Sequence, residues 1–429
     1  MGLNGSRTFV GFGLGPIQAG LFLAEALNSG AFKRLVVAEV APDLVNAVRQ
    51  CDGLLAVNVA HADGLERQAI GPIEILNPAE KLDREVLTDA IAEADEIATA
   101  LPSVDYYGLG SEVSVARLLA AGLREKALRG HPLAVIYTAE NNNHAAQLLE
   151  EQVMAEVVEH DRPNVAAHIR FLNTVIGKMS LVVTDPNEIA DYGLAPLTST
   201  SHRAVLVETF NRILISRIDF DGGFDRGLQV FEEKEDLLPF EEAKLYGHNA
   251  THALGGYLGA LAGGTTMSEL GTLGLLPFLR SAFIEESGEA LIQRHQGIDP
   301  LFTHAGYTEY ADDLLIRMTN PLLHDRVDRI TRDTERKLGW DDRLIGTMRA
   351  VLASRIHPFR YAVGAAAASA SLDPAVVDHP DAVTPLLERI WRKPARDSSP
   401  LVDAIKLGLA SLRRWRDSGF ADHATLEHR

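Results

Sequence analysis

The architecture of this 429-residue chain follows from one segment near its start, Phe9-Val10-Gly11-Phe12-Gly13-Leu14-Gly15-Pro16-Ile17-Gln18-Ala19-Gly20. A short apolar run, Thr8 to Phe12, stops at the glycines, and apolar residues then recur at helical spacing from Ile17 to Leu27. A strand, a tight turn and a helix in this order open a βαβ unit. Such a turn needs residues that tolerate positive φ, and Gly13 and Gly15 supply them.

The same alternation continues through the first half of the chain. Further short apolar runs predict strands at Leu35 to Val40, Ile73 to Leu76, Glu96 to Leu101 and Leu133 to Thr138, with helical segments between them. From Glu241 onward the pattern is mostly helical, interrupted by glycines and prolines. We therefore expect an α/β protein with a Rossmann-type parallel-sheet domain over residues 1–200 and a mostly α-helical domain over 201–429.

The composition limits the classes of function. Lysine and arginine number 41 against 59 acidic residues, which gives a formal net charge of −18. That charge argues against nucleic-acid and membrane-surface partners, because both are anionic. The single cysteine, Cys51, cannot form an internal disulfide, and we find neither a signal peptide nor a membrane-spanning run, so the cytoplasm is the expected compartment.

The glycine turn predicts a dinucleotide site. A pyrophosphate needs bare backbone and free N–H groups at the start of a helix, which Gly13 and Gly15 provide. The usual third glycine is Gln18 here, and Gly20 lies two residues on. Glu39 ends the second predicted strand, where a carboxylate binds ribose hydroxyls and repels a 2′-phosphate, so we expect NAD as the cofactor. The alternative is a glycine turn that binds no ligand.

A second informative segment is Lys244-Leu245-Tyr246-Gly247-His248-Asn249-Ala250-Thr251-His252. At about 100° per residue in a helix, His252 lies roughly 80° and Asn249 roughly 140° from Lys244. Alcohol oxidation without a metal needs a base and amide donors, and a buried lysine beside positive charges can serve as that base. Two other interpretations stay open: Lys244 is a surface residue, or His248 and His252 are two zinc ligands.

These residues resemble the polyol-specific long-chain dehydrogenases, the mannitol dehydrogenase family. The pattern Lys244-x4-Asn249-x2-His252 is similar to the family signature, and the later block from Arg336 to Gly346 is similar to its late helical signature. Glu140-Asn141 and Val207 to Phe210 are similar to two further family segments. The resemblance covers the chain from about Phe9 to about Ala368.

The resemblance implies NAD, zinc-independent chemistry and a site between the two domains. It makes Lys244 the general base, Asn249 and Asn141 the residues that hold the reacting oxygen, and His252 the residue that positions substrate hydroxyls. Asn141 alternatively caps the following helix. The expected reaction interconverts a polyol or polyol phosphate, such as mannitol 1-phosphate, with the matching ketose or ketose phosphate, such as fructose 6-phosphate. The expected partner is this small-molecule substrate, and the sequence does not predict an oligomeric state.

One departure from the family pattern keeps other functions open. Family members carry an Asp-Arg pair after an apolar strand, and this chain has Gly177-Lys178 there. Lys178 is either an exposed lysine or a point charge for a phosphate or carboxylate. A sugar acid, such as a hexuronate-derived ketose, is therefore an alternative substrate, and a dinucleotide-binding regulatory protein without turnover is an alternative of another class.

Overall fold

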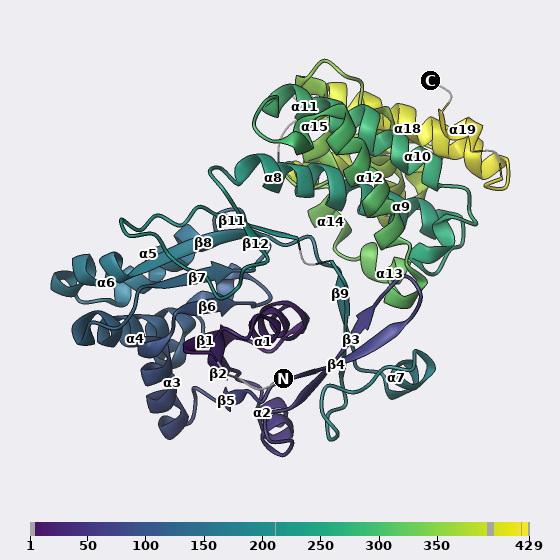
Figure 1. The fold of residues 1–429 in the computed structure, drawn as a ribbon. Coiled ribbons are helices and arrows are strands. Elements are labelled where there is room, and N and C mark those ends of the chain that lie inside the picture. The colour runs from purple at the N-terminus through teal and green to yellow at the C-terminus, as the bar shows by residue number, and fades with distance from the viewer. Residues whose placement is uncertain (1–4, 211, 393–398, 422, 428–429) are drawn as a thin grey trace. The chain divides into compact units, whose positions relative to one another are not determined.

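The computed structural model describes residues 5–210, 212–392, 399–421 and 423–427, and the chain forms two compact units, Met1–Leu238 and Pro239–Arg429 (Figure 1). The first unit contains an eight-stranded sheet. In spatial order its strands are β12 (Phe231–Lys234), β11 (Ile213–Ser216), β8 (Ile169–Val175), β7 (Ala134–Thr138), β6 (Glu96–Thr99), β1 (Arg7–Phe12), β2 (Phe32–Ala38) and β5 (Glu74–Leu76). All paired strands are parallel except β11, which runs antiparallel to β8.

The sheet is covered on both faces, which is why its central strands are apolar throughout. Val10 of β1 packs in one core with helices α3 (Lys81–Glu93), α4 (Val115–Arg129) and α5 (Ala145–Glu156). The neighbouring Phe9 points to the other face, into a core with the helical segments η1 (Gln18–Leu23) and α1 (Ala24–Ser29). The parallel sheet with helices confirms the predicted fold class of this part of the chain.

A second sheet was not predicted from the sequence. Its order is β4 (Leu65–Ile70), β3 (Leu55–Ala60), β10 (Ala204–Glu208) and β9 (Ser180–Val183), and it packs behind η1. The predicted domain boundary, in the Thr198 to Ser201 stretch, precedes β10, β11 and β12. Because these three strands complete the two sheets, the first compact unit extends to Leu238 instead of ending near residue 200.

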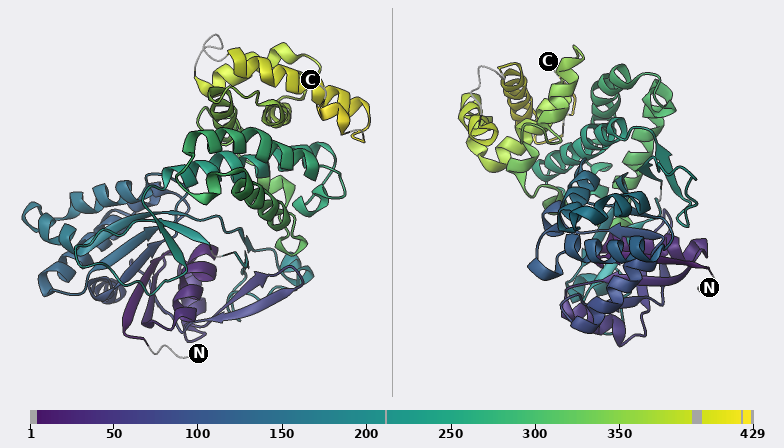
Figure 2. Two further views of the ribbon diagram at one scale, coloured as in Figure 1. Left: turned by 45° about the horizontal axis from the view of Figure 1, so that its top comes forward. Right: turned by 90° about the vertical axis from the view of Figure 1, so that its left-hand side faces the viewer.

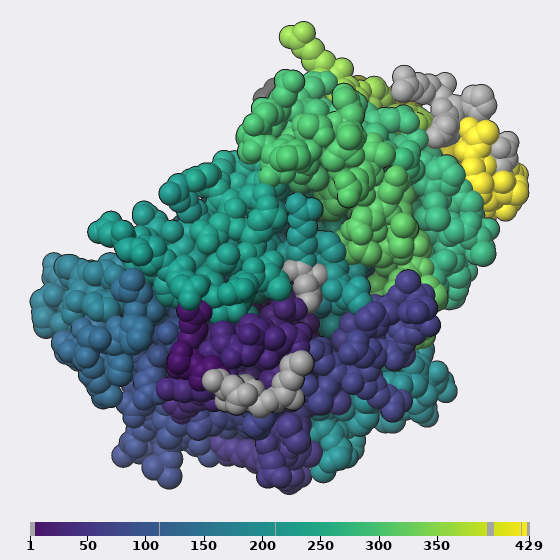
Figure 3. Space-filling view, in the orientation of Figure 1, coloured from purple at the N-terminus to yellow at the C-terminus, as the bar shows by residue number. Residues whose placement is uncertain are grey.

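The second unit is built of helices, which run from green to yellow in both views of Figure 2. Close packing depends on small residues: a Cβ at Gly408 of α18 would lie 2.7 Å from the carbonyl oxygen of Ala362 in α16. In the space-filling view of Figure 3 the residues of this unit form the green and yellow part of the surface. Its principal helices are α8 (Leu238–Glu242), η5 (Ala243–Asn249), α9 (Ala250–Leu261), α10 (Leu276–Ser281), η7 (Ala282–Gly288), α11 (Glu289–His295), α12 (His304–Met318), α13 (Val327–Ile330), α14 (Thr334–Lys337), α15 (Ile345–Ala353), α16 (Phe359–Leu372), α17 (Val383–Trp391) and α18 (Ser399–Asp417).

Candidate functional site

The glycine turn lies at the carboxyl end of β1, where the strand order of the sheet reverses between β2 and β6. Ligands of open parallel sheets bind at this switch point. Gly13 has φ +81°, and a Cβ there would lie 3.0 Å from the carbonyl oxygen of Ala100, so only glycine fits. Gly15 has more room, because its Cβ would lie 3.9 Å from the same oxygen. Because Gly15 has no side chain, its backbone is exposed to the cavity that it lines.

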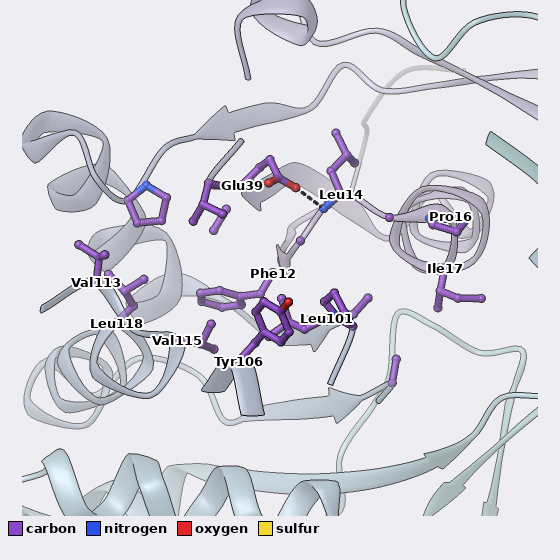
Figure 4. Close-up of a pocket in the computed structure, with 18 of the residues that line it drawn as sticks. Phe12, Leu14, Pro16, Ile17, Glu39, Leu101, Tyr106, Val113, Val115 and Leu118 are labelled. Atoms are coloured by element: carbon purple, nitrogen blue, oxygen red, sulfur yellow. Dashed lines mark hydrogen bonds between the residues drawn. The ribbon is translucent and has the colours of Figure 1, made fainter. Parts of the chain in front are cut away.

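A cavity of about 520 Å³ opens beside the turn, entirely within the first unit (Figure 4). This volume lies in the range of small-molecule and cofactor sites. Apolar side chains form one wall, and Figure 4 shows Phe12, Val113, Val115 and Leu118 together there. The turn and the neighbouring loops complete the lining with Gly13, Leu14, Gly15, Pro16, Ile17, Glu39, Tyr106, Asn141 and Arg203.

Glu39 lies at the rim of this cavity and is tied to the turn. One carboxylate oxygen accepts a hydrogen bond from the backbone N–H of Leu14 at 2.8 Å, drawn as the dashed line in Figure 4. The other oxygen accepts from the N–H groups of Val40 and Ala41 at 2.8 and 2.9 Å. The end of β2 and the glycine turn are thereby held together by one side chain.

Gln18 and Gly20 face away from the cavity. The Gln18 side chain is fully buried over Gly11 of β1, where an added Cβ would lie 2.2 Å from the amide nitrogen. Within the described part of the chain, neither side-chain amide atom of Gln18 has a hydrogen-bond partner. A Cβ at Gly20 would lie 2.6 Å from Cγ1 of Val207 in β10. Gly20 therefore permits close packing of η1 on the second sheet and does not line the cavity.

Asn141 lies exposed on the loop after β7 and lines the cavity. The cap position of α5 is His144 and not Asn141, so the alternative of a helix cap for Asn141 is wrong. The preceding residue, Glu140, is buried beneath the loops after β6 and β7. Its carboxylate accepts hydrogen bonds from the Thr99 hydroxyl at 2.9 Å, the Leu101 N–H at 2.8 Å and the Tyr107 hydroxyl.

Glu140 was not predicted as a functional residue. Burial raises the pKa of its carboxyl group, although the hydrogen bonds from Tyr107, Leu101 and Thr99 oppose that rise. By joining two loops that line the cavity, it fixes the backbone around the site. Two signals for it were present in the sequence: its place directly before Asn141 at the end of a strand, and the similarity of Glu140-Asn141 to a family segment.

The lysine segment forms a π-helix, η5, and not the α-helix assumed from the sequence. A π-helix has i→i+5 hydrogen bonds and a wider turn, so residues five apart lie closer to one face than in an α-helix. Lys244 and Asn249 are five apart, and their angular separation is therefore smaller than the α-helical spacing predicts. Short π-helical segments within helices are frequent at functional sites.

Lys244 is half-buried, so it is not an ordinary surface lysine. Burial and the nearby positive charge of Arg343 lower the pKa of its amine to about 8, and Glu241 opposes this shift. At pH 8 roughly half of the amines are then neutral and able to accept a proton.

His252 is held by a partner that was not predicted. Its Nε2 lies 2.8 Å from the Asp325 carboxylate, which also accepts hydrogen bonds from Arg329 at 2.6 and 3.0 Å. Burial alone would raise the pKa of Asp325, but the hydrogen bond from His252 and the charge of Arg329 lower it. Asp325 is buried in the loop before α13. It is far from His252 in the sequence, so only the tertiary structure shows that the two side chains are neighbours.

His248 is buried beside this pair, with the two imidazole rings 6.4 Å apart. Burial, together with the charge of Arg317, lowers the pKa of His248 well below its ordinary value, so the His248 ring is neutral at pH 7. Among the residues that the structure describes, no three histidine, cysteine or acidic side chains are arranged to hold a metal ion. The two-histidine zinc interpretation therefore lacks a third ligand in this part of the chain.

The late signature block packs against the lysine helix. The Thr347 hydroxyl lies 3.2 Å from the Tyr246 carbonyl oxygen, and a Cβ at Gly346 would lie 2.7 Å from the Tyr246 ring. Arg343, bonded to Asp342 at 2.9 Å, lies close enough to lower the pKa values of both Lys244 and Lys337. The two most specific motifs of the sequence therefore lie against each other within the second unit.

Lys178 is neither exposed nor a free point charge. It is buried, and its amine donates hydrogen bonds to the backbone carbonyl oxygens of Glu208 and Phe210, the latter at 3.1 Å. The expectation of an exposed lysine was wrong, because the backbone of Glu208 and Phe210 covers the amine and its carbonyl oxygens accept hydrogen bonds from it.

Comparisons with known proteins agree with this geometry. The model of the mannitol dehydrogenase C-terminal domain matches residues 236–374. Mannitol-1-phosphate 5-dehydrogenase of Bacillus licheniformis is 28% identical over 373 residues, which cover 87% of this chain and 89% of that protein. The protein of the same name from Bacillus pumilus is 27% identical over 338 residues, which cover 78% and 81%.

Two solved structures share the fold. Mannitol 2-dehydrogenase of Pseudomonas fluorescens, in a ternary complex with NAD and D-mannitol, matches with a TM-score of 0.69 and 18% identity, covering 100% of this chain and 95% of that one. A D-sorbitol dehydrogenase in substrate-free form matches with a TM-score of 0.73 and 15% identity, covering 99% and 95%.

The two curated relatives are dehydrogenases and match most of the chain, which identifies the chain as a dehydrogenase. Residues 236–374 match the mannitol dehydrogenase C-terminal domain, and most of the chain is similar to mannitol-1-phosphate 5-dehydrogenases. None of the helices in the described ranges combines the length and the apolar character needed to cross a bilayer.

Proposed function

We propose that this chain is an NAD-dependent, metal-independent dehydrogenase that interconverts a polyol or polyol phosphate with the corresponding ketose or ketose phosphate. The observation that carries the proposal is the half-buried Lys244 amine with a pKa lowered to about 8, on the same π-helix as Asn249. A general base acts best when its pKa lies near the working pH.

In the proposed oxidation, neutral Lys244 accepts the proton of the reacting hydroxyl group. Bound NAD supplies the hydride acceptor. The side-chain amides of Asn249 and of Asn141 donate hydrogen bonds to the oxygen as negative charge develops on it. In the reverse direction Lys244 returns the proton and the ketose is reduced.

His252 has a separate proposed task. When the neutral ring donates its Nε2 proton to Asp325, its Nδ1 is left as an acceptor for a substrate hydroxyl. The carboxylate of Asp325 thus sets both the tautomer and the orientation of the ring. A polyol offers several hydroxyl groups, so a fixed acceptor selects one orientation of the substrate.

The cavity beside the glycine turn supports NAD as the cofactor. Its volume, the bare backbone at Gly13 and Gly15 and the carboxylate at Glu39 suit a dinucleotide, with Glu39 facing the ribose hydroxyls. A 2′-phosphate would be repelled by the same carboxylate. Replacement Glu39→Ala is therefore expected to lower the ratio of kcat/KM with NAD to kcat/KM with NADP by tenfold or more.

The charges around Lys244 favour an anionic substrate. Arg343 and Lys337 lie in the same cluster, and burial together with Arg343 and Arg336 lowers the pKa of Lys337 to about 8. Such a cluster suits the phosphate of mannitol 1-phosphate. A sugar acid stays the second candidate for the same reason, although Lys178 no longer supports it.

The test is a rate assay with NAD on mannitol 1-phosphate, mannitol and a hexuronate-derived substrate, with and without EDTA. We expect NADH formation that EDTA leaves unchanged and that is fastest with the phosphate. Absence of turnover on the whole panel contradicts the proposal, and inactivation by EDTA contradicts its metal-independent part. A preference for the acid selects the second candidate.

A further inference from the structure

We infer that Arg203 binds a phosphate oxygen of the dinucleotide in the cavity beside the glycine turn. This inference rests on the proposed function, since it requires that the cavity bind a dinucleotide. Neither the glycine turn nor the similarity to known family motifs points to this residue. It is identified because it lines the cavity from a different part of the chain, next to β10.

An anionic ligand in this cavity needs a positively charged side chain beside it. Among its lining residues Glu39 is the carboxylate and Arg203 the cationic side chain. The pyrophosphate of a dinucleotide is anionic, and the whole chain carries a formal net charge of −18, so the cavity lies in an unfavourable field. A local arginine compensates both, and its planar guanidinium matches the geometry of phosphate oxygens.

Arg203 does not form an ion pair with Glu39. The two oxygens of Glu39 accept hydrogen bonds from the backbone N–H groups of Leu14, Val40 and Ala41. In the ranges that the structure describes, the Arg203 guanidinium forms neither an ion pair nor a hydrogen bond with another side chain. It is half-buried, which strengthens its interaction with a bound anion compared with an exposed arginine.

The backbone of Arg203 is held in place. Its carbonyl oxygen accepts a hydrogen bond from the Leu197 N–H at 2.8 Å, and its N–H donates to the Ser201 hydroxyl at 3.2 Å. Anchoring of the main chain reduces the entropy lost when the side chain orders on a ligand. We assign the contact to the pyrophosphate and not to a 2′-phosphate, because Glu39 at the rim disfavours the latter.

The experiment measures the dissociation constants of NADH and NADPH for the full-length chain by fluorescence titration. The variants are Arg203→Gln, which removes the charge, and Arg203→Lys, which keeps it. Lys33→Gln, an exposed lysine of β2 outside the cavity, is the control for a general change of charge. Thermal unfolding of each variant without ligand checks that the fold is retained.

We expect Arg203→Gln to weaken both dinucleotides by the same factor, about tenfold or more, and Arg203→Lys to restore part of the affinity. Binding of the wild type should also weaken more steeply with added salt than binding of Arg203→Gln. A loss confined to NADPH overturns the pyrophosphate assignment in favour of a 2′-phosphate contact. Unchanged affinity for both overturns the inference while leaving the proposed function intact, whereas a wild type that binds neither dinucleotide overturns both.

Discussion

The hydroxyl group of Thr347 in helix α15 lies 3.2 Å from the carbonyl oxygen of Tyr246 in the π-helix that carries Lys244, and it also donates to the carbonyl oxygen of Arg343. Gly346, the residue before Thr347, lets the two elements approach at the ring of Tyr246. Arg343, just before α15, is thereby kept close to the amine of Lys244. Burial and the charge of Arg343, a residue from a motif almost a hundred positions later, together lower the pKa of Lys244.

Replacement of the proposed base is the most direct test of the mechanism. Lys244→Ala should lower kcat by about 10² to 10⁴ while NADH binding to the first unit is retained. In the wild type the oxidation rate should rise with pH through about 8 and level off above it, because only the neutral amine accepts a proton. A variant with undiminished turnover, or a rate that falls across this pH range, contradicts the assignment.

Arg343 is expected to control the position of that pH profile. Arg343→Gln removes the positive charge that helps to lower the pKa of Lys244, so the rising limb should move to higher pH. Arg343→Lys keeps a charge and should move the limb less. Rates of both variants with a neutral polyol, measured from pH 6 to 10, separate this effect from lost binding of an anionic substrate.

Asp325→Asn should impair the orientation of His252. The amide has nearly the same volume as the carboxylate but cannot form an ion pair with Arg329, so kcat/KM should fall by about tenfold to a hundredfold, corresponding to about 1.4–2.7 kcal/mol. An unchanged kcat/KM would show that His252 needs no such partner.

The same variant has a signature in stability. The pKa of Asp325 is lowered in the folded protein, so its contribution is present above the ordinary pKa of an aspartate and is lost as the pH falls through the lowered value. The wild type should therefore unfold at a higher temperature than Asp325→Asn at neutral pH. The difference should shrink in acid, and a difference that grows there contradicts the pairing.

Replacement of Gly20 and replacement of Gly15 by alanine should have different effects on the free energy of unfolding. A Cβ at Gly20 would overlap Val207, so Gly20→Ala should reduce the free energy of unfolding by about 1–3 kcal/mol, and adding Val207→Ala should relieve part of that loss. Gly15→Ala has room for its Cβ and should leave the stability almost unchanged. Chemical denaturation of the four proteins measures this, and equal losses at both glycines contradict it.

Local order along the chain was enough to predict much of this protein. The β1 strand, the glycine turn and the following helix are encoded in adjacent residues, and the helical second half is visible as periodicity. Lys244, Asn249 and His252 also lie within one short segment, so their proximity needs only the rise and turn of a helix. A ligand site was predicted at Gly13, Gly15 and Glu39 because a parallel sheet brings the ends of neighbouring strands together, and the structure has a cavity lined by these residues.

Contacts between segments far apart in the sequence could not be predicted from local patterns and were shown only by the tertiary structure. The second sheet pairs β3 with β10, about 150 residues later, and no local pattern specifies such a partner. Asp325, Arg203 and the buried role of Lys178 depend on the same kind of contact, as does the packing of Gly20 on Val207. Burial and neighbouring charge arise from the packed tertiary structure, and these are what bring the pKa of the Lys244 amine near the pH at which a base is useful.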